Sequence, residues 1–155
     1  METRTVGQTK TIVSQLMLPT DANPSGQVHG GAIMKLVDTV GGVVAMRHSR
    51  LRAVTARMDE MSFLHPVFVG DLLILKASVN NVGRTFMEVG VRVEAENLRT
   101  GVVTHTASAY MLYVALDDEG KPTEVPRLVS ETEDEVRRKA AAQRRKAARE
   151  RPPID

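Results

Sequence analysis

The sequence contains no cysteine and no tryptophan, and it has only three phenylalanines and two tyrosines among its 155 residues. The lack of cysteine excludes disulfides, thiol catalysis and cysteine-ligated metal sites. The shortage of aromatic residues means that aliphatic side chains, methionine and alanine have to build the core. No apolar run is long enough to span a bilayer, and no N-terminal segment has the pattern of a signal peptide. We therefore expect a cytoplasmic protein without a membrane partner.

The net charge of +2 is distributed unevenly along the chain. Residues 1–130 carry 13 basic and 13 acidic side chains, whereas residues 131–155 carry eight basic and six acidic ones. A neutral body argues against a nucleic-acid-binding domain, because affinity for nucleic acid depends on neutralising phosphates. We therefore predict one globular domain over 1–130 and a basic helical tail over 131–155.

Hydrophobic periodicity predicts one strand, one long helix and four further strands, in that order. Apolar residues cover most of the circumference of segment 31–49, which is typical of a buried helix. Because short turns separate the last four strands, we expect an antiparallel four-strand meander. A curved sheet around one central helix, which is an α+β fold, fits this order. The predicted strands cover residues 9–18, 53–67, 71–82, 86–97 and 102–116.

The tail begins with two alternative helix-capping patterns, Ser130 with Glu133 and Thr132 with Glu135. Acidic residues crowd its first turn and basic residues its end, an order that complements the helix dipole. Before Pro152, its only apolar side chains are Val136 and several alanines. We therefore expect an exposed or loosely docked helix.

The segment before the long helix combines polar residues with turn formers. Gly30 and Gly31 open the predicted helix, where the first backbone N–H groups have no intrahelical acceptors. Glycine also lets a ligand approach the backbone closely. A developing negative oxygen could be stabilised there, as in an oxyanion site. An ordinary glycine turn is the alternative.

Asp38 is the only acidic residue of segment 31–49 and follows Gly31 by about two helical turns, so both lie on one stripe. A carboxylate among apolar residues is costly to bury unless it is paired or functional, and desolvation would raise its basicity. It could instead share a narrow solvent-facing stripe with Lys35. Asn23 could orient a water or a carbonyl. No serine nucleophile with a histidine partner is apparent, which favours attack by an activated water.

The four histidines have no metal-ligand spacing, and we expect no metal site. Residues 15–38 resemble the signature of hotdog-fold acyl-CoA thioesterases, the group of the bacterial YciA-type enzymes and the brain acyl-CoA hydrolase. Further matching motifs follow in order, and the resemblance covers about residues 8–128. One departure is local: Thr39 follows Asp38, where the family usually has an acidic residue.

The resemblance implies a curved antiparallel sheet around a long helix, with Asp38 and Asn23 as the catalytic pair. It also implies that the two residues come from different subunits of a dimer, and that three dimers form a hexamer. We therefore expect an acyl-CoA thioesterase that releases free fatty acid and CoA. Amides near Gly30 and Gly31 would polarise the carbonyl, while Asp38 activates water or attacks directly to form an anhydride.

Coenzyme A is part of the substrate and product, and no separate cofactor is expected. Its phosphates would lie at a basic rim that includes Arg84 or the tail arginines, and the acyl chain in an apolar tunnel beside the helix. Two alternatives remain: a hydratase or dehydratase of the same fold, for which the histidine before the helix would serve, and a non-catalytic acyl-CoA sensor. The candidates for substrate binding are His29, Thr55, Arg57 and Arg84.

Overall fold

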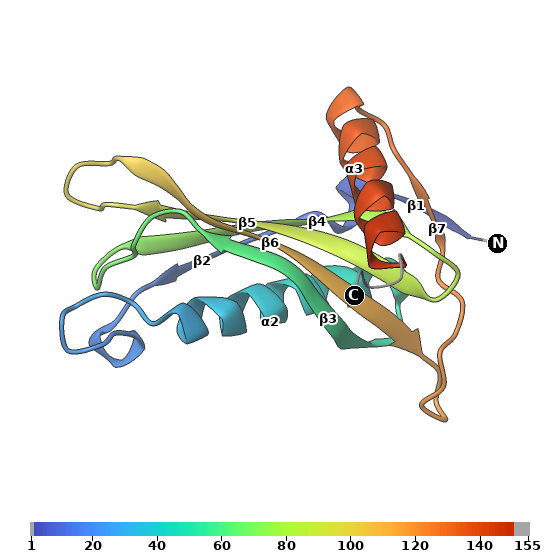
Figure 1. Cartoon of the computed structure of the whole chain (residues 1–155), viewed down its shortest axis with the longest axis horizontal. Helices are drawn as coiled ribbons and strands as arrows, with labels where there is room; N and C mark the ends of the chain where they lie inside the picture. Colours follow the sequence, from blue (N-terminus) through green and yellow to red (C-terminus); the bar gives the residue numbers. More distant parts are fainter. Residues whose placement is uncertain (1, 151–155) are drawn as a thin grey trace, which may run out of the picture.

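One long helix, α2 (Gly30–Ser49), lies along one face of a five-stranded antiparallel sheet (Figure 1). The structure is a computed structural model and describes residues 2–150. The strand order in the sheet is β2-β4-β5-β6-β3. The expected α+β architecture with a central helix is therefore confirmed. The strands are β2 (Thr11–Leu16), β3 (Arg52–Phe63), β4 (Leu72–Val82), β5 (Phe86–Glu96) and β6 (Val103–Leu116).

The core lies between α2 and the inner face of the sheet. The helix buries side chains spaced four, three and four residues apart, which form one stripe of an α-helix. Each fully buried valine of this kind contributes about 1.5–3 kcal/mol relative to an exposed one. The other side of α2 is exposed in the protomer, with Met34 at 40% and Met46 at 44%. The expectation of a helix buried on all sides is therefore wrong for the protomer. The helical stripe consists of Ile33, Val37, Val40 and Val44.

Strand β3 does not pair with the next strand along the chain. It pairs with β6 at one edge of the sheet, while β4 lies between β2 and β5. The expected hairpin of 53–67 with 71–82 is therefore wrong. The connection is not a tight turn: Val67 is buried, and its carbonyl accepts a 2.7 Å hydrogen bond from the amide of Val28. The meander over β4, β5 and β6 is confirmed.

Three short elements near the two ends of the described chain were not predicted. Strand β1 (Thr3–Thr5) pairs in parallel with β7 (Arg127–Val129), and the one-turn helix α1 (Val6–Thr9) follows β1. Segments this short carry no periodicity that a sequence could reveal. A 3-10 turn, η1 (Pro19–Asp21), precedes the loop before α2. Across residues 2–150, none of the helices combines the length and apolar character needed to cross a membrane.

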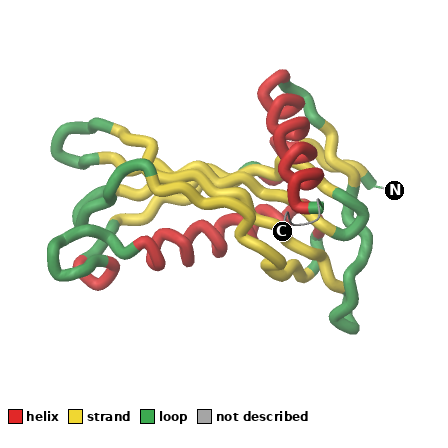
Figure 2. Tube along the Cα trace, in the orientation of Figure 1, coloured by secondary structure: helices red, strands yellow, loops and turns green. Residues whose placement is uncertain are grey.

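Helix α3 (Glu133–Arg149) lies against the outer face of the sheet, opposite α2 (Figures 1 and 2). Thr132, not Ser130, caps it, in a capping box with Glu135. The apolar content of α3 is low, as the sequence indicates. Its attachment depends instead on charged side chains.

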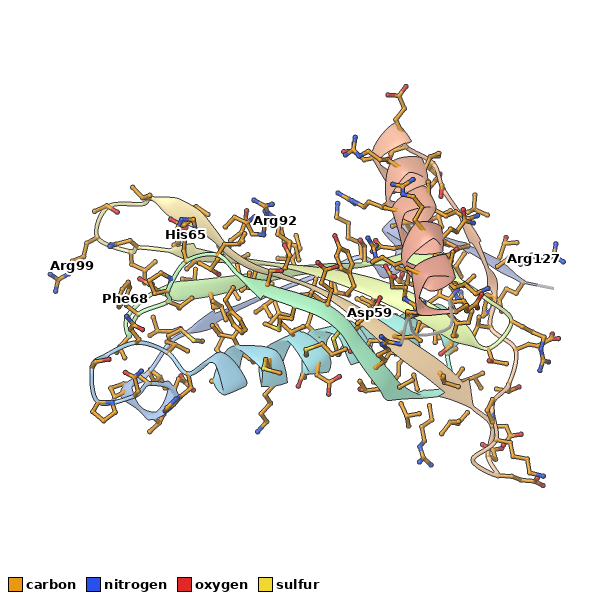
Figure 3. All side chains as sticks on the ribbon, viewed as in Figure 1. Asp59, His65, Phe68, Arg92, Arg99 and Arg127 are labelled. Atoms are coloured by element: carbon orange, nitrogen blue, oxygen red, sulfur yellow. The ribbon has the colours of Figure 1, made fainter. Side chains whose placement is uncertain are left out.

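A buried ion pair holds α3 on the sheet. Arg145 donates two hydrogen bonds to Glu88 of β5, at 2.7 and 3.2 Å, and its guanidinium lies 3.6 Å from the ring centroid of Tyr110. The side chain of Glu88 is only 2% exposed. Arg149 pairs with Asp59 of β3 at 2.7 Å, where Figure 3 places Asp59 beside the end of α3. The expectation of an exposed or loosely docked helix is therefore wrong for the second half of α3, whereas the first half is largely exposed.

Candidate active site

Asp38, in the middle of α2, receives hydrogen bonds from two neighbouring strands. Thr55 on β3 and Tyr113 on β6 are directly opposed in the sheet register. The Thr55 hydroxyl donates to Oδ1 of Asp38 at 2.6 Å. The Tyr113 hydroxyl lies 3.1 Å from the same Oδ1 and 2.9 Å from the backbone carbonyl oxygen of Asp38. Within residues 2–150, Oδ2 has no hydrogen-bond partner, so it is the free oxygen of the carboxylate.

Tyr113 is a candidate site residue that the sequence did not reveal. Its side chain is 1% exposed and stands on the inner face of β6. Burial raises the pKa of its hydroxyl, and the charge of Asp38 raises that pKa further. The hydroxyl therefore keeps its proton and acts as a donor. The feature of the sequence that could have pointed to Tyr113 is a glycine inside α2, Gly41.

Gly41 explains how a tyrosine reaches the backbone of α2. A Cβ atom added at Gly41 would lie 2.4 Å from the Tyr113 hydroxyl oxygen, which is inside van der Waals contact. At Gly42 the nearest Tyr113 atom would be 3.8 Å away, an ordinary contact. A glycine inside a helix costs about 1 kcal/mol relative to alanine. The first of the two glycines is thus explained by close approach, and the second is not.

Asn23 belongs to the loop before α2, and its side-chain oxygen is held by three donors. Oδ1 accepts from the amide and hydroxyl of Ser25, at 3.1 and 2.6 Å, and from the amide of Gln27 at 3.2 Å. Gly26 has a φ of +87° and closes this turn. Because backbone amides fix which end of the side chain is oxygen, the NH₂ group points away from the turn. In the described chain that group has no partner, so it is an available donor.

The start of α2 is open to a ligand. A Cβ atom at Gly31 would meet nothing within 4 Å, and one at Gly30 would meet only the ring of Phe63, at 3.4 Å. Within residues 2–150 the amides of Gly30 and Gly31 have no acceptor, whereas those of Ala32 and Ile33 donate to the carbonyl of His29. His29 is exposed at the N-cap position, where its side chain makes no capping hydrogen bond. This end of the helix has the free donors that an oxyanion requires.

One protomer does not bring all these groups together. Asp38 lies eight residues after Gly30, which is about 12 Å along an α-helix. The idea that one helix both polarises a carbonyl and activates the attacking water is therefore wrong for a single chain. The protomer carries two separate parts, which we name the loop half-site (Asn23, Gly30 and Gly31) and the helix half-site (Asp38, Thr55 and Tyr113).

The other predicted binding residues have simpler surroundings. Arg57 on β3 forms an ion pair with Asp59 at 3.2 Å, and its side chain is 53% exposed. Arg84, in the turn between β4 and β5, lies 3.6 Å from Glu124 and is 74% exposed. Tail arginine Arg138 lines a cavity of about 330 Å³ between α3 and the outer face of the sheet. The sheet separates that cavity from Asp38, so within one protomer it lies apart from both half-sites.

A long helix lying in a curved five-stranded antiparallel sheet is the hotdog arrangement of thioesterases. The chain belongs to the thioesterase superfamily, whose family model matches residues 25–102. The Helicobacter pylori protein VdlD is 41% identical over 147 residues, which cover 95% of this chain and 84% of the relative.

Two solved structures have the same fold over nearly the whole chain. A hexameric acyl-CoA thioesterase solved without ligand aligns with a TM-score of 0.93 and 38% identity, covering 96% of each chain. The acyl-CoA hydrolase of Staphylococcus aureus, solved with butyryl-CoA, CoA and CoA disulfide, aligns with a TM-score of 0.89 and 31% identity. That alignment covers 95% of this chain and 90% of the other. The expected family is therefore confirmed.

Proposed function

We propose that the protein is an acyl-CoA thioester hydrolase that works as a homo-oligomer, with each active site built from two protomers. The observation that carries the proposal is the held carboxylate of Asp38, which presents a free Oδ2 but lies about 12 Å along α2 from the free amides at the start of that helix. The loop half-site supplies the missing donors. Acyl-CoA is the substrate class of the solved relatives that align over the whole chain.

The spacing of the proposed residues supports this assignment. Solved alanine variants of the Staphylococcus aureus hydrolase replace an asparagine, an aspartate and a threonine. In that enzyme the aspartate follows the asparagine by 15 positions, and the threonine follows the aspartate by 17. Asn23, Asp38 and Thr55 have the same spacings here. The threonine is the residue that bonds to Asp38 in this chain.

The shape of the protomer supports a two-fold partner. Strand β3 is a sheet edge, because within residues 2–150 it pairs only with β6. Helix α2 lies in contact with β3, and its Met34 and Met46 are exposed in the protomer. In a two-fold interface the same patch meets itself, so β3 and α2 of each protomer would meet their copies running in opposite directions. The loop half-site of one protomer then faces the helix half-site of the other. We place three such dimers in a hexamer, and a solved relative of the same fold is hexameric.

The chemistry follows from these groups. The thioester carbonyl oxygen accepts hydrogen bonds from the helix-start amides, and the free NH₂ of Asn23 holds the attacking water or the carbonyl. Oδ2 of Asp38 takes a proton from water as the water oxygen bonds to the acyl carbon. The tetrahedral oxyanion collapses, the C–S bond breaks, and the leaving sulfur takes the proton back from Asp38. Direct attack by Oδ2, giving an anhydride that water hydrolyses, uses the same geometry.

The first test measures release of free CoA from saturated acyl-CoA thioesters. Asp38→Ala, with the oligomer intact, should lose about 100-fold or more in kcat, which is typical of removing a general base. Asp118→Ala is the matched control, because that aspartate is exposed in the turn after β6. An unchanged rate in the Asp38 variant, or no CoA release by the wild type, contradicts the proposal.

A second test separates a two-protomer site from a single-chain site. Asn23→Ala and Asp38→Ala chains are each nearly inactive, but a mixed dimer has one site in which both residues are intact. Refolding or co-expressing the two in equal amounts should therefore recover about a quarter of the wild-type rate, since half of randomly formed two-fold dimers are mixed. No recovery in verified mixed dimers would mean that both residues act from one chain.

We place the enzyme in the cytoplasm, because its polyanionic substrate does not cross a bilayer unaided.

A further inference from the structure

We propose that Tyr113 is a positioning residue for hydrolysis: together with Thr55 it fixes Oδ1 of Asp38, so that Oδ2 alone faces the attacking water. The inference rests on the proposed function, because it assigns a role within the same site. It starts from the contacts of one hydroxyl group, which lies 3.1 Å from Oδ1 and 2.9 Å from the carbonyl oxygen of the same aspartate.

The two contacts of Tyr113 tie the carboxylate to the helix backbone. A hydroxyl that shares its hydrogen between the side chain and the main chain of one residue restricts the rotation of that side chain. Thr55 donates to Oδ1 from the neighbouring strand at 2.6 Å. With two donors, Oδ1 is the less basic oxygen of the carboxylate. Proton transfer is therefore directed to Oδ2, which has no partner within residues 2–150.

The position of Tyr113 on β6 indicates that this contact is built into the core. The inward-facing neighbours Met111 and Ala115 are apolar and buried, so a hydroxyl at this place needs a partner inside the protein. The ring is fixed by packing, and the pairing with Thr55 across the strands holds both donors on the same face. A donor held in this way needs no rearrangement during the reaction, which is what electrostatic preorganisation requires.

Gly41 supplies the independent observation. Glycine weakens a helix relative to alanine, and here the Tyr113 hydroxyl occupies the space that an alanine Cβ would fill. The close approach brings the hydroxyl, rather than the ring alone, to the backbone of α2. The sequence therefore keeps a weaker helix residue at the place where the hydroxyl reaches Asp38.

The experiment compares Tyr113→Phe with Tyr110→Phe. Both variants remove one hydroxyl from β6, but Tyr110 lies on the outer face under Arg145. A hydrogen bond to a charged group accounts for roughly 10-fold or more in rate when it is lost. We expect Tyr113→Phe to lower kcat by about 10-fold with little change in KM, and to move the acid limb of the pH–rate profile to higher pH. We expect Tyr110→Phe to match the wild type in both measurements.

Each outcome has a defined meaning. A Tyr113→Phe enzyme with wild-type kcat and an unmoved acid limb overturns the inference, as does a loss that appears only in KM. A rate loss with the acid limb unmoved also overturns it, because that result indicates a structural role. Should Tyr113→Phe fail to fold, Gly41→Ala displaces the same hydroxyl, and the same fall in kcat and shift of the acid limb are required. Absence of any CoA release by the wild-type protein contradicts the proposed function instead, so the two failures are distinguishable.

Discussion

Replacing Arg145 with alanine removes the ion pair with Glu88 that holds α3 on the sheet, together with the contact between the guanidinium and the Tyr110 ring. The change leaves the Glu88 carboxylate, 2% exposed, without the fork of two hydrogen bonds that neutralises it. Removing one partner of a buried ion pair costs about 3–5 kcal/mol. The lower end applies here, because Asn80 still donates to Glu88 at 3.1 Å and Arg149 lies 3.9 Å from it.

The expected loss is therefore about 3 kcal/mol, which lowers the Tm of a domain of this size by about 6–12 °C. Thermal and urea unfolding at one fixed protomer concentration measure it, since oligomer stability depends on concentration. Arg144→Ala is the matched control, because Arg144 is the exposed neighbour on the same helix. It should change the free energy of unfolding by less than about 0.5 kcal/mol.

Two results would refute this reasoning. One is an equal, small effect of both substitutions, which would mean that α3 is not docked. The other concerns the double variant Glu88→Met with Arg145→Met, which replaces the pair with apolar side chains of similar length. Because no buried charge is then left unpaired, it should be much more stable than Arg145→Ala. If the double variant is as unstable as Arg145→Ala, the loss of stability does not come from the unpaired charge of Glu88.

The remaining predictions concern pH and helix packing. Burial lowers the pKa of His48 below its ordinary 6.5, so the unfolded chain binds a proton that the folded chain excludes. The free energy of unfolding should fall as pH drops below about 6.5, by up to about 1.4 kcal/mol per unit, and His48→Gln should remove that slope while His65→Gln does not. Gly41→Ala should destabilise the fold by about 1–3 kcal/mol because of Tyr113, whereas Gly42→Ala should be neutral or stabilising in the same unfolding assay.

The long elements could be predicted because each buries one face over many residues. Alternation over 86–97 indicates β5, and its inward residues Met87, Val89, Val91 and Val93 are at most 3% exposed. The hydrophobic pattern of a strand does not reveal which other strand it pairs with. Strands 53–67 and 71–82 look like a hairpin, but β3 lies at the far edge of the sheet and Val67 in the connection is buried.

The candidate site was predictable where residue chemistry is unusual for its place. Asp38 stands out as a carboxylate in an apolar helix, and Asn23 as an amide in the polar segment before that helix, while their role as a catalytic pair came from the resemblance. Tyr113 was missed, because a tyrosine in an apolar strand looks like an ordinary core residue. Glu88 was missed because it alternates with the inward apolar residues of β5 and so looks like an ordinary exposed residue. Its burial depends on Arg145, which lies 57 residues away in the chain.

The exposed edge strand β3 makes the activity depend on protein concentration if the active site is built from two protomers, as we propose. Within residues 2–150 its outer row of backbone N–H and C=O groups has no strand beside it, and such a row is a template for any extended chain. A protomer separated by dilution would lose the partner's half-site from its active site. It would also expose the unpaired backbone groups of β3, which can pair with other chains. Specific activity should therefore fall on dilution, and long storage of dilute samples should favour aggregation over recovery.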